Sequence, residues 1–210
     1  MKDITETDED LLYRTFGIDA ELLIDHAWGR ESTTIADIKA YTPQSSSVST
    51  GQVLHEGYGV SGARLLILEM AELLSLDLVR DGMAAGGMNI SLGYSYSGDV
   101  PPAHGSFMFP APTSSTRRLL EYTGALYDRV AARDSNVYRL TICFDRLVPE
   151  ASLQYDMFSS SATQDRERRL QNALIDIKQK YGKNGIFKGM NLLEGAKTIE
   201  RNAQIGGHKA

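Results

Sequence analysis

The sequence predicts an α+β fold in which two helices lie on one face of a four-stranded sheet. Between residues 48 and 148 the spacing of apolar residues alternates between a period of two and a period near 3.6. This pattern gives the order strand, helix, strand, strand, helix, strand. Two helices are enough to cover one face of such a sheet, so the other face is expected to stay open.

The predicted elements of this region follow one another closely. A short strand near residues 49–54 precedes a long helix, which Gly82 is placed to end. The clearest strand is 88–94, where apolar residues alternate with small polar ones. A strand near 105–109 is expected to end at Pro110 and Pro112. A second helix over 114–132 and a last strand over 137–144 complete the region.

The flanking segments have a different character. Residues 1–40 carry two short amphipathic helices separated by Gly17, and residues 41–47 contain a proline and several serines, which is typical of a linker. The sheet region is expected over 48–148 and a tail over 149–162. Residues 163–210 are expected to form a C-terminal helix that ends at Gly182, followed by an extension. The helix carries Leu170, Leu174, Ile177 and Tyr181 on one side.

Composition narrows the class of protein. The longest apolar run, residues 65–68, is too short to span a membrane, and the N-terminus lacks the pattern of a signal peptide, so a soluble cytoplasmic protein is expected. The lone Cys143 cannot form an internal disulfide or a cysteine metal cage. The net charge of −5 argues against a general attraction to nucleic acid, although residues 1–40 hold 10 of the 27 acidic groups.

Polar side chains on two predicted strands point toward the open face of the sheet. They are Asn89, Ser91, Arg139 and Thr141. Short hydrogen-bonding groups and an arginine of this kind hold phosphate oxygens without distinguishing bases. Periodicity alone leaves two interpretations open, a nucleic-acid backbone site and a plain solvated sheet face.

Two other patterns resemble catalytic or cofactor sites. Residues 57–62 match the glycine fingerprint of dinucleotide sites, but the nearby Asp77 and Asp81 precede the second strand, so a strand-to-helix turn is favoured. Asp25 and His26 are adjacent on a helix and point about 100° apart, which disfavours an acid–base pair. No metal-ligand spacing is found in the sequence, so no cofactor or metal is expected.

The most specific short motif lies in the predicted tail. Residues 154–158 read Gln-Tyr-Asp-Met-Phe, and the segment resembles the pentapeptide that binds the bacterial sliding clamp. In such a peptide Met157 and Phe158 are apolar anchors for a pocket, Gln154 forms a hydrogen bond at its rim and Asp156 occupies the third place. The motif more often has leucine in place of this methionine.

Several longer stretches resemble one family. Residues 11–17, 20–29 and 33–38 are similar to the end of the thumb domain in Gram-positive Y-family translesion DNA polymerases of the DinB/UmuC type. Residues 47–54 resemble the linker and first strand of that family's little-finger domain. Segments between residues 170 and 209 resemble the C-terminal ending of the same polymerases. The family's little finger is a four-stranded sheet backed by two helices, which agrees with the strand and helix order above.

The resemblance implies that this chain binds damaged or intact primer–template DNA through its backbone and is tethered to the sliding clamp. It adds six candidate DNA contacts, which are Ser47, Ser49, Thr50, Ser114, Ser115 and Thr116. The last three precede a predicted helix, where free backbone amides favour a phosphate, although simple N-capping explains the same residues.

The resemblance also implies what the chain lacks. The carboxylates that hold two magnesium ions in the family lie in a palm domain that precedes the thumb, so this chain is not expected to polymerise DNA alone. Magnesium is expected only in a full-length polymerase. Two alternatives remain open, a module that occupies the clamp or another protein with little affinity for DNA, and a small nucleotide-binding enzyme that uses residues 57–62.

Overall fold

The chain divides into two compact units, Met1–Gln44 and Ser45–Ala210. The computed structural model describes residues 2–40, 47–94, 101–132, 135–152, 161–205 and 208–209. Within these residues no helix is both long and apolar enough to cross a membrane.

The first unit is a small group of helices. They are α1 (Lys2–Thr5), α2 (Glu9–Phe16), α3 (Asp19–Ala27) and α4 (Ile35–Ala40). Asp8 accepts a hydrogen bond from the amide of Asp10 and caps the start of α2. Gly17 separates α2 from α3 with a φ of 60°, which confirms the predicted break. Their core is small, with Leu12, Ala20 and Ile24 buried.

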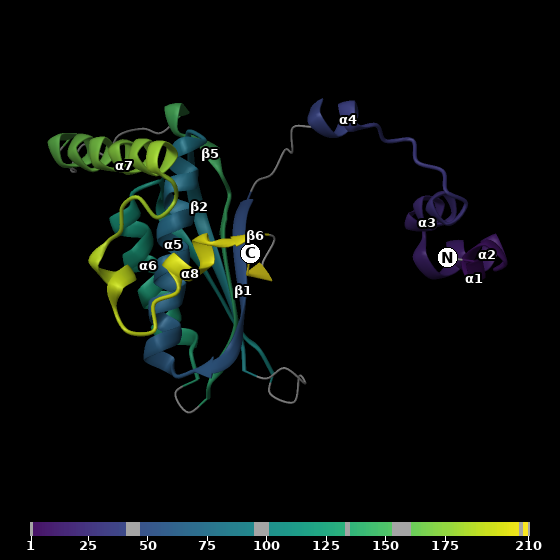
Figure 1. Cartoon of the computed structure of the whole chain (residues 1–210), viewed down its shortest axis with the longest axis horizontal. Helices are drawn as coiled ribbons and strands as arrows, with labels where there is room; N and C mark the ends of the chain where they lie inside the picture. Colours follow the sequence, from purple (N-terminus) through teal and green to yellow (C-terminus); the bar gives the residue numbers. More distant parts are fainter. Residues whose placement is uncertain are drawn as a thin grey trace. The chain divides into compact units, whose positions relative to one another are not determined.

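The second unit is built on an antiparallel sheet with the strand order β1-β4-β2-β3 (Figure 1). Its strands and intervening helices are β1 (Ser47–Tyr58), α5 (Val60–Arg80), β2 (Met83–Gly93), β3 (Ala103–Thr113), α6 (Thr116–Val130), β4 (Val137–Asp145) and the short β5 (Val148–Pro149), which pairs with β2. This arrangement confirms the predicted α+β fold and the order of its elements.

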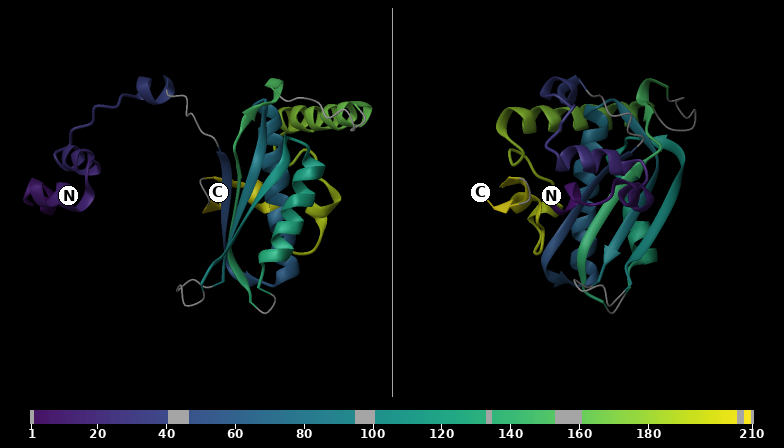
Figure 2. Two further views of the ribbon diagram at one scale, coloured as in Figure 1. Left: turned by 180° about the vertical axis from the view of Figure 1, so that it is seen from behind. Right: turned by 90° about the vertical axis from the view of Figure 1, so that its right-hand side faces the viewer.

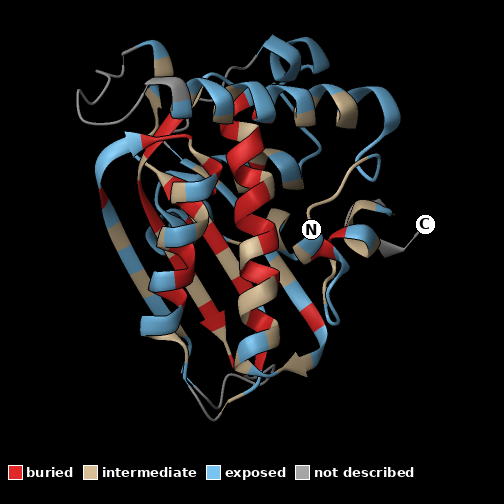
Figure 3. Ribbon diagram, turned by 90° about the vertical axis from the view of Figure 1, so that its left-hand side faces the viewer, coloured by how far each residue is buried: buried red, intermediate tan, exposed pale blue. Residues whose placement is uncertain are grey.

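Helices α5 and α6 cover the same face of the sheet and leave the opposite face open (Figure 2). Alternate residues in the central parts of β2 and β4 are buried against them, for example Ile90, Leu92, Leu140 and Ile142. Figure 3 shows the buried residues concentrated on α5, on α6 and on the strands beneath them. Burial of this apolar surface is the main force that fixes the strand register, because a shift by one residue would expose the whole set.

The predicted end of the third strand is wrong. Pro110 does not end the third strand, since β3 continues through Pro112 to Thr113. The reason is that β3 lies at the edge of the sheet, where within the described ranges it pairs with β2 alone. A proline at such an edge needs no hydrogen-bonding partner for its missing N–H group.

The C-terminal region belongs to the same unit and packs on α5. It contains η1 (Glu150–Ser152), α7 (Ser161–Tyr181), η2 (Gly189–Leu192), α8 (Thr198–Asn202) and the paired short strands β6 (Gln204–Ile205) and β7 (His208–Lys209). Gly182 ends α7 with a φ of 89°, as predicted. The side of α7 that carries Leu170 and Tyr181 is not a buried stripe, because both side chains are exposed whereas Gln171 is buried.

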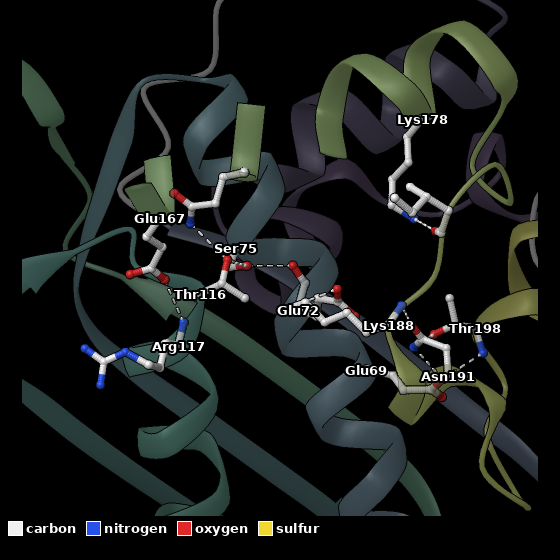
Figure 4. Close-up of polar contacts among 12 residues, drawn as sticks. Glu69, Glu72, Ser75, Thr116, Arg117, Glu167, Lys178, Lys188, Asn191 and Thr198 are labelled. Atoms are coloured by element: carbon white, nitrogen blue, oxygen red, sulfur yellow. Dashed lines mark hydrogen bonds and ion pairs between the residues drawn. The ribbon is translucent and has the colours of Figure 1, made fainter. Parts of the chain in front are cut away.

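Two buried carboxylates of α5 hold the C-terminal extension (Figure 4). Glu69 accepts hydrogen bonds from the Asn191 side chain and from the backbone amide of Lys197. Glu72 forms an ion pair with Lys188, whose Nζ lies 3.3 Å from Oε1 of Glu72. The extension is therefore attached to the outer side of α5 by buried, charge-assisted contacts.

Candidate nucleic-acid interface

The register of the four strands aligns side chains in rows across the open face. One row contains Ser49 of β1, Cys143 of β4, Asn89 of β2 and Ser106 of β3. The next row contains Gly51, Thr141, Ser91 and His104. The outer rows begin at Ser47, which pairs with Asp145, and at Val53, which pairs with Arg139. This face is rich in small polar groups and has no large aromatic side chain in these rows.

Six of the predicted DNA contacts lie together on this face. Ser47 and Ser49 come from β1, Arg139 and Thr141 from β4, and Asn89 and Ser91 from β2. They share a face because alternate residues of a strand point the same way and because these three strands are neighbours. Residues that lie about 40 to 90 positions apart in the sequence are thus brought to one surface.

A shallow depression lies at the centre of the face. Its volume is about 380 Å³, and it is lined by Asn89, Ile90, Ser91, His104, Gly105, Ser106, Thr141 and Cys143. Hydroxyl, amide and imidazole groups surround it, so it offers both donors and acceptors of hydrogen bonds. Hydroxyl and amide groups of this kind can form hydrogen bonds with the phosphate oxygens of a nucleic-acid backbone.

The charged groups of the face differ in their pairing. Among the described residues, Arg139 forms no ion pair, so its guanidinium is available to a phosphate. Asp145 accepts a hydrogen bond of 2.5 Å from the Asn89 side chain. This bond fixes the orientation of the Asn89 amide and accounts for one of the two Asp145 oxygens.

Cys143 is part of the face but is not set up as a nucleophile. Burial raises the pKa of its thiol, the nearby Asp145 charge raises it further, and a hydrogen bond with Ser47 lowers it only in part. The thiol therefore stays protonated near neutral pH and behaves as a small sheet residue.

Thr50 is not brought to the open face. It pairs with Ile142, which is fully buried against the helices, so Thr50 lies on the helix side of β1. The adjacent Ser49 pairs with Cys143 and lies on the other side. The alternation along β1 thus places Ser49 and Thr50, which the family resemblance suggested as neighbouring DNA contacts, on opposite faces of the sheet.

Ser114, Ser115 and Thr116 are also away from the open face, where α6 begins and α7 packs on it. Ser115 is the N-cap of α6, and its hydroxyl lies 2.8 Å and 2.9 Å from the two oxygens of Glu167. The amide of Arg117 donates to the same carboxylate at 3.0 Å (Figure 4). The anion at this helix start is therefore a side chain of α7, which occupies the place predicted for a phosphate.

The neighbouring contacts make this junction compact. Gln171 of α7 donates to the carbonyl of Ser114 at 2.8 Å and to the hydroxyl of Thr116 at 2.9 Å. Thr116 in turn shares a hydrogen bond of 2.8 Å with Ser75 of α5. Ser114 and Thr116 are almost fully buried by these contacts, so DNA cannot reach them while α7 stays in place.

The predicted clamp-binding residues Gln154, Asp156, Met157 and Phe158 lie outside the described residues. The structure describes the chain on either side of them, up to Ser152 and again from Ser161.

The motifs that resembled other sites have structural roles here. Gly57 lies in β1, where a Cβ atom would come within 2.7 Å of both Asn136 and Tyr138, and Gly59 precedes the first turn of α5. His26 pairs with Glu31 at 2.8 Å instead of with Asp25. Among the described residues no group of three or more histidine, cysteine or acidic side chains could hold a metal ion.

The open face also includes His104 and Ser106 of β3, which were not among the predicted contacts, and Arg146, whose Nη1 lies 3.6 Å from the sulfur of Met108 on the same strand. His104 and Ser106 alternate with the inward-facing residues of β3, so the period-two pattern applied to that strand would have found them. Arg146 follows the end of β4 and has no such signal, because its position depends on an irregular backbone.

Comparison with known proteins agrees with this geometry. Residues 45–157 match the C-terminal domain of the impB/mucB/samB family, which is the little finger of Y-family DNA polymerases. No curated protein matches the chain. The match covers more than half of the 210 residues and includes the whole sheet and its two covering helices. The catalytic domain of the family is not detected in the chain. The chain therefore belongs to the impB/mucB/samB family, and its sheet unit is the DNA-binding little finger of a Y-family polymerase.

Proposed function

We propose that the open face of the sheet binds the backbone of primer–template DNA during translesion synthesis. The observation that carries this proposal is the register that gathers Ser47, Ser49, Asn89, Ser91, Arg139 and Thr141 on the one sheet face without covering helices. Backbone contacts of this type position a protein on DNA without selecting a sequence. That property suits an enzyme which must act wherever a lesion occurs.

The charge of the chain limits how tightly this face binds. The net charge is −5, so long-range attraction to DNA is weak, and binding depends on local groups such as Arg139 and the hydroxyls. Only a few phosphates are then neutralised. The proposal thus predicts modest affinity with a shallow dependence on salt, close to one unit of slope for each phosphate contacted.

We further propose that Gln154, Asp156, Met157 and Phe158 tether the chain to the sliding clamp. Support comes from the match of residues 154–158 to a clamp-binding pentapeptide and from their place between the little finger and α7. A tether raises the effective concentration of a weak DNA-binding domain at the primer end. Weak DNA binding and clamp tethering therefore complement each other.

A single titration tests both parts. Fluorescence anisotropy of labelled primer–template DNA is measured across salt for the wild type, for Arg139→Gln and for Gln154→Ala/Phe158→Ala, with and without the bacterial sliding clamp. We expect Arg139→Gln to weaken direct DNA binding and to lower its salt slope by about one. The double variant should bind DNA as the wild type does but lose the gain from the clamp.

Other outcomes separate the two parts. Clamp association without DNA binding at low salt would favour a module that only occupies the clamp. If neither the double substitution nor the clamp changes DNA binding, the proposed clamp tether is wrong, while the proposed DNA binding stands.

A further inference from the structure

Arg146 stands out because its backbone is strained. Its φ of 52° lies in the left-handed region, and among the described residues no other non-glycine residue has a positive φ. An L-amino acid with a Cβ atom adopts this conformation at a cost in free energy that glycine does not have. An observed outlier of this kind is a reason to look for a function of the side chain.

The strained backbone sends the Arg146 side chain to the open face. Alternation along β4 would place the residue after Asp145 on the helix side. Instead, Nη1 of Arg146 lies 3.6 Å from the sulfur of Met108, which pairs with Gly87 in the same row as Asp145. The guanidinium therefore reaches across β2 to the edge strand β3.

A pair of glycines in β2 makes this path possible. A Cβ atom on Gly86 would come within 3.1 Å of the Cβ of Arg146, and one on Gly87 within 2.5 Å of an Asp145 oxygen. The amide of Gly86 also donates to the carbonyl of Arg146 at 3.2 Å. The bend after β4 and the irregular register of β2 near Gly86 thus fit each other.

The Arg146 guanidinium forms no strong interaction within the described part of the chain. Arg146 is exposed and forms no ion pair there, and its contact with the Met108 sulfur is weak. Arg139 lies near the start of β4, whereas Arg146 follows its end, so the two residues stand at opposite ends of this strand. Two unpaired cations therefore bracket the polar rows of the face.

We propose that Arg146 is a phosphate-binding residue of the little finger, and that its strained backbone is kept because it places the guanidinium on the open face. The proposal rests on the proposed binding of DNA by this face and adds a contact outside the regular strands. Since the strain serves binding and not folding, residues that tolerate a positive φ should fold at least as well and bind DNA less well.

The test compares five variants by DNA titration across salt and by thermal unfolding. Arg146→Asn and Arg146→Gly remove the charge and tolerate the left-handed conformation, whereas Arg146→Lys keeps the charge. Arg117→Gln is the matched control, because it removes one charge from the helix layer, where the Arg117 side chain forms an ion pair with the exposed Glu121. Arg139→Gln tests whether the open face contributes to DNA binding independently of Arg146.

We expect the Asn and Gly variants to unfold at the same or a higher temperature than the wild type, while the salt slope of DNA binding falls by about one. The Lys variant should keep the slope, and Arg117→Gln should leave it unchanged. Wild-type binding by the Asn and Gly variants, with a loss in Arg139→Gln, would overturn the role of Arg146 alone. Absence of salt-dependent binding by the wild type would instead reject the proposed function.

Discussion

Replacing Glu69 by glutamine should release the C-terminal extension from α5. The Glu69 side chain is 1% exposed. Its Oε1 accepts from the Asn191 amide at 2.9 Å and from the Thr198 backbone at 3.4 Å, and its Oε2 accepts from the Lys197 backbone at 2.8 Å. Glutamine keeps the shape but has only one acceptor oxygen, so its NH₂ group must face an N–H donor.

The expected loss follows from these contacts. One charge-assisted hydrogen bond disappears and leaves a buried donor unsatisfied, which costs about 1.5–3 kcal/mol. The remaining bonds weaken because the acceptor is neutral. Burial lowers the pKa of Arg201, and the Glu69 charge opposes that shift. Glu69→Gln therefore also removes a negative charge that stabilises the buried Arg201 guanidinium. Together these effects destabilise the sheet unit by about 3 kcal/mol, or roughly 6–12 °C in melting temperature.

Urea and thermal unfolding followed by circular dichroism measure this loss. The control is Glu121→Gln, which removes an equal charge from an exposed pair with Arg117 and should cost less than about 0.5 kcal/mol. A loss below about 1 kcal/mol for Glu69→Gln would refute the reasoning, since it would mean that the buried carboxylate does not hold the extension.

Three further predictions concern buried contacts of the same unit. Burial raises the pKa of Tyr127 to about 12, so stability is full below pH 10 and should fall by up to about 3 kcal/mol as pH rises to 12. Tyr127→Phe lacks the ionisable hydroxyl and its hydrogen bond to the Val60 carbonyl. Urea unfolding of this variant, measured at each pH, should therefore lack this loss of stability at alkaline pH. Gly57→Ala should destabilise by about 1–3 kcal/mol in urea, because its Cβ would lie 2.7 Å from the Tyr138 ring; an unchanged midpoint would contradict the close packing. Gln171→Leu should cost about 2 kcal/mol and make α7 more accessible to a protease, since it leaves the Ser114 carbonyl unsatisfied; wild-type protease resistance would speak against this junction.

The regular part of the fold could be predicted from the sequence. The alternation of Ile90 and Leu92 with Asn89 and Ser91 gave both the strand and the side of the sheet on which each residue lies. This works because a half-buried strand must alternate apolar and polar residues. The strand residues that lie on the open face follow from the same rule, whereas the position of Arg146 after the end of β4 does not.

The remaining features depend on tertiary contacts that periodicity does not contain. Pro110 was expected to end a strand, but its effect depends on whether the strand lies at the edge of the sheet. For Ser115 the sequence left phosphate binding and N-capping open; Ser115 is the N-cap of α6, and its contact with Glu167 of α7, some 50 residues later, has no signal in the local pattern. Gln171 is buried in place of Leu170 for the same reason, because the polar start of α6 selects the side of α7 that it contacts.

The most direct test of the central claim places a negative charge at the middle of the open face. Thr141→Asp changes little volume and adds one charge beside the depression, and Asn172→Asp adds the same charge on the exposed side of α7. In a DNA titration at low salt we predict that Thr141→Asp weakens binding by about tenfold or more while Asn172→Asp binds as the wild type does. Equal binding by both variants, with both folded, would contradict the account, because DNA would then contact another surface of the little finger.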